Sequence, residues 1–131
     1  MDKKEVLEYF SHDRYAVDTT GIEILIAEKD HAKTRLKIRD GHLNADNNVM
    51  GGCIYTLADY TFAIAANVDN LPTCTLSSNI IFNAPARGDY LYAESSVVKS
   101  GKTIATFEVR VTDENQRLIA TSTMMGFRKQ N

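Results

Sequence analysis

The chain has 131 residues, of which 44% are hydrophobic and 24% are charged, so it is long enough to bury a sizeable core. Its formal net charge of −2, together with the absence of any long run of lysine or arginine, argues against a nucleic-acid partner. No apolar run is long enough for a membrane span, and the charged start lacks the apolar stretch of a signal peptide. We therefore expect a cytoplasmic protein that forms one domain over residues 1–131 and has no membrane partner.

The two cysteines, Cys53 and Cys74, show neither CxxC spacing nor neighbouring histidines. A metal site or a disulfide framework is therefore not expected, and both side chains are interpreted as small members of the core. We therefore expect neither a metal nor a redox cofactor.

Hydrophobic periodicity and turn-forming residues divide the chain into a short helix, two strands, one long helix and four further strands. The predicted elements span residues 3–11, 21–28, 31–39, 47–67, 73–83, 90–99, 103–112 and 117–128. Lys29 and Asp30 suit a tight hairpin between the first two strands, the second of which should expose one face to solvent. His31, at the start of that strand, is interpreted as structural.

The last three predicted strands are separated by polar turns, so they should form an antiparallel meander. A six-stranded sheet of this kind must cover one of its faces, and only the long helix is apolar enough to do so. The predicted fold is therefore α+β, with a six-stranded antiparallel sheet wrapped around one long central helix.

The long helix carries the residues that suggest chemistry. Its apolar positions recur at helical spacing: Ile54, Leu57, Ala58, Phe62 and Ala65. Asp59 is the one carboxylate within this apolar surface, and Gly51 and Gly52 stand at the helix start, where backbone N–H groups have no intrahelical partner. A buried acid and free N–H groups suit an acyl-transfer site. The alternative is ordinary turn and cap chemistry with an Asp that faces solvent.

Two further features could supply binding groups. The polar loop of residues 40–48 leads into the long helix, and loops in such a position often hold ligands, so His42 and Asn44 are candidates. Farther along, Tyr55, Tyr60 and Phe62 hint at a roomy or aromatic pocket.

At this point the chain resembles the PaaI-type hotdog-fold acyl-CoA thioesterases, over roughly residues 20–128. The motifs that carry the resemblance are Leu43-Asn44, Met50-Gly51-Gly52, Leu57-Ala58-Asp59, Asn79-Ile80-Ile81-Phe82-Asn83-Ala84-Pro85-Ala86 and Ser100-Gly101-Lys102-Thr103. The resemblance implies the hotdog fold, hydrolysis of an acyl-CoA, and dimers that often pair into tetramers. The family usually has a histidine before the two glycines, and Met50 replaces it here.

The resemblance also implies a role for individual residues. Gly51 would present its N–H to the thioester carbonyl, and Asp59 would act as nucleophile or general base. Asn44 would help to hold the site, and Thr75 would position the attacking water, with Ser77 in its place if the loop is shifted.

Other residues are expected to bind the substrate rather than to react with it. They are Gly52, Met50, Tyr55, Phe62, Ser77 and Lys102. Lys102 could hold a phosphate of CoA, and so could Lys99, Arg87 and Arg128, although basic residues at strand ends are more often only solvated.

The spacing of the two reactive groups has a structural consequence. Gly51 and Asp59 lie eight residues apart, which is about 12 Å along one helix, too far for both to contact one thioester. A two-fold dimer with the two long helices antiparallel brings Gly51 of one subunit opposite Asp59 of the other, which gives two identical sites.

Two other classes of function remain to be compared with hydrolysis. A non-catalytic module that binds an acyl-CoA or another acyl ligand would have the same fold and pocket without turnover, because Met50 replaces the histidine. A hotdog hydratase would need a histidine paired with an acid on the helix, and no histidine lies there.

Overall fold

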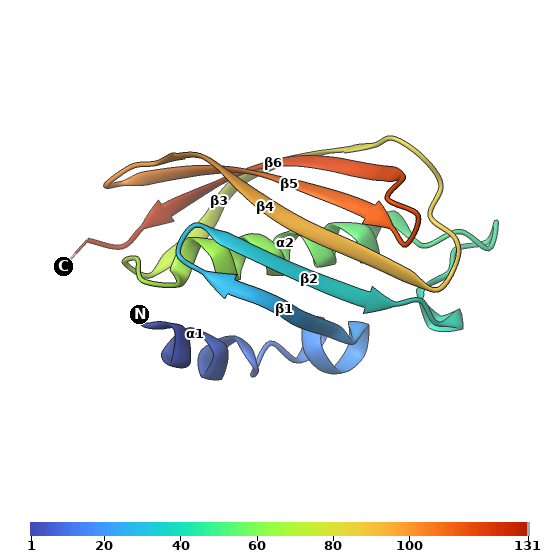
Figure 1. Ribbon diagram of the computed structural model, residues 1–131, viewed down its shortest axis with the longest axis horizontal. Coiled ribbons are helices and arrows are strands. Elements are labelled where there is room, and N and C mark those ends of the chain that lie inside the picture. The colour runs from blue at the N-terminus through green and yellow to red at the C-terminus, as the bar shows by residue number, and fades with distance from the viewer. Residues whose placement is uncertain (131) are drawn as a thin grey trace.

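The computed structural model describes residues 1–130, in which one long helix lies against the concave face of a six-stranded antiparallel sheet (Figure 1). The strands are β1 (Ile22–Glu28), β2 (His31–Lys37), β3 (Thr73–Phe82), β4 (Tyr90–Ser100), β5 (Ile104–Asp113) and β6 (Leu118–Arg128). The helices are α1 (Lys3–Phe10), the π-helix η1 (Tyr15–Thr20), the 3-10 helix η2 (Asp40–His42) and α2 (Gly51–Asn67). The strand order β1-β2-β4-β5-β6-β3 confirms the predicted meander.

Helix α2 contacts every strand of the sheet, as its apolar periodicity predicts. Leu57 and Ile64 have no exposed surface, and the ring of Phe62 packs edge-on against Phe107 at 5.5 Å between centroids. The helix begins at Gly51 rather than at residue 47, because Asn47 has a φ of 59° and the preceding loop is closed by a bridge between Leu43 and Val49.

The β1–β2 hairpin agrees with the sequence pattern. Asp30 adopts a φ of 61° in the tight turn. The sheet-core positions of β2 are buried, with Thr34 and Leu36 at 0% exposure. His31 forms an exposed hydrogen bond with Glu94, at 2.7 Å between Nε2 and Oε2, which fits a structural role.

The N-terminal segment packs on α2 as well. Helix α1 begins with a capping box between Asp2 and Glu5, and the Tyr60 hydroxyl of α2 donates to the Phe10 carbonyl at 2.9 Å. Helix η1, which the sequence pattern does not predict, follows the turn after α1 and ends at Gly21, whose φ is 85°. No helix within residues 1–130 is both long and apolar enough to cross a membrane.

Strand β3 forms an edge of the sheet and pairs only with β6. Its side chains are largely exposed, and three of them are large and apolar: Leu76, Ile81 and Phe82, at 58%, 57% and 52% exposure. The register with β6 shifts between Thr75 and Ser77, so that Leu76 is an extra residue in a β-bulge.

Candidate active site

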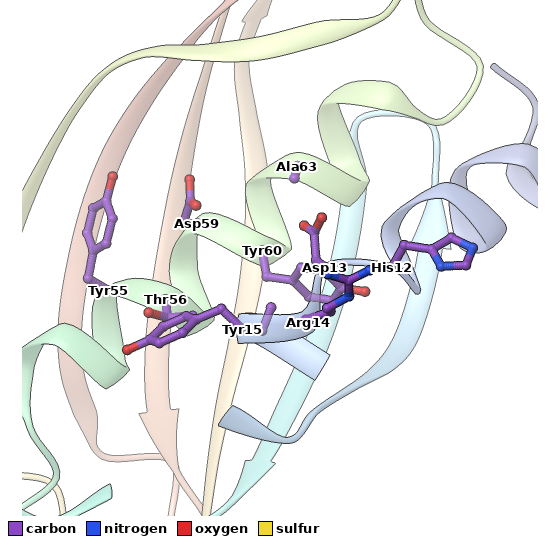
Figure 2. A pocket seen from close by; sticks show the side chains of 10 residues that line it. His12, Asp13, Arg14, Tyr15, Tyr55, Thr56, Asp59, Tyr60 and Ala63 are labelled. Carbon is purple, nitrogen blue, oxygen red and sulfur yellow. The ribbon is translucent and has the colours of Figure 1, made fainter. Parts of the chain in front are cut away.

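The side of α2 that faces away from the sheet is only partly covered. Tyr55, Thr56, Asp59 and Ala63 form a half-buried stripe at helical spacing. A hollow of about 490 Å³ lies beside this stripe, and residues 12–16 of the N-terminal segment close it from the other side (Figure 2). A second hollow of about 400 Å³, bounded by Pro72 to Thr75, also reaches Asp59. Asp59 therefore stands where two hollows meet.

The environment of Asp59 is poor in polar partners. The Thr75 hydroxyl donates to Asp59 Oδ1 at 3.3 Å, a long distance for a bond between two oxygens. Burial raises the pKa of Asp59, the bond from Thr75 lowers it, and the negative charge of Asp13 raises it. A carboxylate in this setting is a stronger base than an exposed aspartate.

The start of α2 is held by backbone bonds and has no side-chain cap. The Met50 N–H donates to the His42 carbonyl at 2.8 Å, and the Met50 carbonyl accepts from the N–H groups of Cys53 and Ile54. Among the described residues, the N–H groups of Gly51 and Gly52 have no partner. They are free to bind an oxygen that carries negative charge, which the helix dipole favours.

The two glycines differ in their surroundings. A Cβ atom at Gly51 would lie 3.1 Å from the ring of Phe82, whereas a Cβ atom at Gly52 would meet nothing within 4 Å. The missing side chain of Gly51 therefore lets the ring of Phe82, the last residue of the exposed edge strand, lie close to the helix start. Gly51 and Asp59 stay about 12 Å apart along α2, so one chain does not bring them together.

Strand β3 presents Thr75 and Ser78 to α2, but not Ser77. Thr75 contacts Asp59, and the Ser78 hydroxyl lies 2.7 Å from the Tyr55 hydroxyl. In a regular strand, Thr75 and Ser77 would share a face, but the bulge at Leu76 shifts the later residues by one position. Ser77 is therefore not on the strand face that contacts α2, which corrects its predicted role as an alternative to Thr75. Ser78 lies on that face instead, next to Tyr55.

Asn44 and His42, the two candidates from the loop of residues 40–48, stabilise that loop by hydrogen bonds. Asn44 Oδ1 accepts from the N–H groups of Asp46 and Asn48, at 2.9 and 3.1 Å. The buried ring of His42 accepts from the Arg39 N–H at Nδ1 and donates to the Thr20 carbonyl from Nε2. His42 is therefore not a ligand group, and neither residue borders the hollows beside Asp59. Through its carbonyl, however, His42 fixes Met50 at the start of α2.

Phe62 is corrected from a substrate-binding residue to a core residue. It is 1% exposed and lies one turn after Ala58, on the side of α2 that faces the sheet.

The two cysteines differ in burial. The sequence pattern predicts Cys74 as a core residue, and this prediction is wrong, because its side chain is exposed on the edge strand. Cys53 is half-buried, and burial raises the pKa of its thiol to about 11.

Arg128 is not available to a phosphate. It is 3% exposed, and its guanidinium donates to the Ala66 carbonyl at 2.9 Å and to the Ser100 hydroxyl at 2.6 Å. Lys102 lies in the turn between β4 and β5, beside a hollow that does not include Asp59. Within one chain, therefore, the structure brings Thr75 and Tyr55 to the Asp59 side of α2 and leaves Lys102 elsewhere.

The N-terminal side of the larger hollow is the part of the site that sequence reasoning missed. His12, Asp13, Arg14 and Tyr15 line it, although they lie between the predicted helix over residues 3–11 and the predicted strand over residues 21–28, where no binding group is expected. Their polarity carries no periodic signal, because they belong to a turn and the start of a π-helix. Only the packing of α1 on α2 places them at Asp59.

Known proteins are similar to this chain in sequence and in fold. The family model described as the thioesterase superfamily matches residues 46–120. A candidate esterase of Archaeoglobus fulgidus is 30% identical over 118 residues, which cover 89% of this chain and 77% of that protein. The acyl-coenzyme A thioesterase PaaI of Escherichia coli is 28% identical over 101 residues, which cover 76% of this chain and 72% of PaaI.

Solved structures agree with these matches. The structure of PaaI from E. coli has a TM-score of 0.90 at 22% identity, and the alignment covers 98% of this chain and 94% of PaaI. A Streptococcus mutans protein solved with bound acetyl CoA has a TM-score of 0.79 at 25% identity, with 84% of this chain and 90% of that chain covered. The predicted hotdog architecture is thereby confirmed.

Proposed function

Because the chain belongs to the thioesterase superfamily and is a PaaI-type hotdog thioester hydrolase, we propose that it cleaves acyl-CoA thioesters to the free acid and coenzyme A. The observation that carries the proposal is Asp59, a half-buried carboxylate with a raised pKa at the meeting point of two hollows. The name of the relative PaaI and the acetyl CoA bound to the S. mutans structure support CoA as the thiol part.

The proposed site needs two copies of the chain. Within one chain, the free N–H groups of Gly51 and Gly52 lie about 12 Å from Asp59 along α2. The edge strand β3 exposes Leu76, Ile81 and Phe82, and the Phe82 ring touches Gly51. A two-fold dimer along β3 would cover this apolar edge and place Gly51 of the partner subunit near Asp59. Pairing of such dimers into tetramers stays a prediction.

In the proposed reaction, the thioester carbonyl oxygen accepts from the Gly51 N–H of one subunit while Asp59 of the other acts on the carbonyl carbon. A single donor to such an oxygen is commonly worth about 100-fold to 1,000-fold in rate. Asp59 either attacks the carbon to form an anhydride, which water then hydrolyses, or removes a proton from an attacking water. In both routes the C–S bond breaks and CoA leaves as a thiolate that takes up a proton. Thr75 holds Asp59 or the water in place.

Substrate class is tested with a panel of aliphatic and aromatic acyl-CoA thioesters and a colorimetric readout of the free thiol. We expect hydrolysis by the wild type and a loss of two or more orders of magnitude in Asp59→Asn. The matched control is Asp46→Asn, an exposed loop acid whose change should leave turnover unaltered. Binding of acyl-CoA without release of thiol by the wild type would contradict hydrolysis and favour a binding module.

The shared site is tested by complementation between two defective variants. Gly51→Val and Asp59→Asn are each expected to be poor catalysts, the first because the Val side chain would crowd the Phe82 ring and the helix start. If each site takes Gly51 and Asp59 from different subunits, co-refolded variants form mixed dimers with one intact site. Activity should then recover to about one quarter of the wild-type value, since half of the dimers are mixed and half of their sites are intact. No recovery would place both groups in one chain.

A further inference from the structure

The turn between α1 and η1 brings a second carboxylate to the site. Asp13 borders both of the hollows that meet at Asp59, and within residues 1–130 no third acidic side chain lines either of them. Figure 2 shows Asp13 on the N-terminal segment and Asp59 on α2, both beside the same hollow. Asp13 is exposed and Asp59 is half-buried, and two carboxylates that border the same hollow influence the ionisation of each other.

The position of Asp13 is fixed relative to α2 by hydrogen bonds. Its N–H donates to the Phe10 carbonyl at 3.1 Å, and its carbonyl accepts from the Val17 N–H at 2.8 Å. The Phe10 carbonyl also accepts from the hydroxyl of Tyr60, the residue that follows Asp59. The turn that carries Asp13 is therefore tied to the helix that carries Asp59.

Neither carboxylate is neutralised within the described residues. The Asp13 carboxylate has no hydrogen bond or ion pair there, and Asp59 has only the Thr75 hydroxyl. The basic groups that line the hollows are His12, Arg14, Lys129 and the amino group of Met1. His12 pairs with Glu8 at 3.5 Å, and the Met1 amino group donates to the Asn70 carbonyl.

The remaining titratable side chains that line the two hollows are four phenols and one thiol. They are the phenols of Tyr9, Tyr15, Tyr55 and Tyr60 and the thiol of Cys74. Although the Asp13 side chain is exposed, partial desolvation raises the pKa of its carboxyl group. Burial raises the pKa of Asp59 most, and the charge of Asp13 raises it further. Among the charged side chains of residues 1–130 that line the hollows with Asp59, Asp13 is the one whose negative charge raises the pKa of Asp59.

We propose that Asp13 is a positioning residue for the reaction, which acts through Asp59 by holding a second negative charge at the two hollows that both carboxylates border. The proposal deepens the proposed function and rests on it. A more basic carboxylate is the better nucleophile or proton acceptor once it is ionised. The same coupling confines activity to a higher pH, because Asp59 must lose its proton before it can act.

The kinetic test compares the pH dependence of kcat/KM in wild type and Asp13→Asn. Removal of the neighbouring charge should raise the ratio of kcat/KM at pH 5 to that at pH 8 by about threefold. Asp13→Glu keeps the charge and should keep the wild-type ratio. Asp18→Asn, an exposed acid of η1 that borders neither hollow, is the matched control and should also keep it. A ratio that is unchanged in Asp13→Asn, or equally raised in Asp18→Asn, would overturn the proposal.

A second readout does not depend on turnover. The ¹³C carboxyl resonance of Asp59, assigned by its absence in Asp59→Asn, is titrated in wild type and in Asp13→Asn. We expect the midpoint to move to lower pH in the variant, and the difference to shrink in 0.5 M KCl because salt screens the interaction. An unmoved midpoint would overturn the coupling. A moved midpoint in a protein that hydrolyses no acyl-CoA would support the coupling while contradicting the proposed function.

Discussion

The two sides of α2 perform different tasks, although they belong to one helix. On the side toward the sheet, Leu57, Ala58 and Phe62 are at most 1% exposed. On the other side, Tyr55 and Asp59 are half-buried and border open hollows. The first side packs and stabilises, whereas the second leaves a carboxylate where a substrate can reach it. Substitutions on the first side should therefore change the free energy of unfolding, and those on the second should change turnover.

The largest effect is expected from Phe62→Ala on the sheet side. Loss of this buried ring and the cavity left behind should lower the free energy of unfolding by about 3–5 kcal/mol. Turnover per folded molecule should change little, because the ring does not reach the hollows. Urea unfolding at fixed protein concentration measures the first quantity. Phe127→Ala, at a 39% exposed position, is the control and should cost less. Equal losses at the two positions would contradict the division between the sides of α2.

Asp59→Asn should have the opposite effects, a large loss of turnover and no loss of stability. Turnover should fall at least 100-fold, about 2.7 kcal/mol of barrier, because the amide can neither attack nor accept a proton. The raised pKa means that ionised Asp59 costs stability above the pKa of the unfolded chain, a cost that is absent at lower pH. The variant should therefore melt at a higher temperature than wild type at pH 7. This advantage should shrink toward pH 4, which thermal unfolding at the two pH values would check.

The β-bulge offers a sharper test on the β3 side of the hollow. Thr75→Val removes the hydroxyl that donates to Asp59 and should lower turnover roughly tenfold, the value of about one hydrogen bond to a charged group. Ser77→Ala, two residues away, should leave kcat unchanged because the bulge moves Ser77 off this face. Comparable losses in the two variants would mean that the strand has regular alternation in solution.

The smallest effect is expected from Met50→His, at a position that belongs to neither side of α2. Met50 is 56% exposed, and the helix start is held by its backbone contacts with His42, Cys53 and Ile54 rather than by its side chain. We therefore expect turnover on aliphatic and aromatic acyl-CoA thioesters to change less than about tenfold, near 1.4 kcal/mol of barrier. A gain of a hundredfold on any of these substrates would show that the family histidine contributes chemistry that this chain lacks.

The sequence by itself determined the order of the elements, the antiparallel meander and the burial of α2. These features depend on patterns that repeat within a segment, with period 3.6 in α2 and period 2 in β2, and on turn residues between segments. It also determined Gly51 and Asp59 as candidates, since a carboxylate in an apolar helix and glycines at its start are visible without coordinates.

Only the tertiary structure decided which face each side chain takes where the repeat is broken. The bulge at Leu76 exchanges Ser77 for Ser78, and no local pattern shows an extra residue that is defined by pairing with β6. Phe62 and Tyr55 are both aromatic residues of one helix, and only the position of the sheet makes the first core and the second accessible. Asp13 lies 46 positions before Asp59 in the chain, and the packing of α1 on α2 brings them to one hollow. Such contacts depend on how separate segments pack together, which no single segment of sequence encodes.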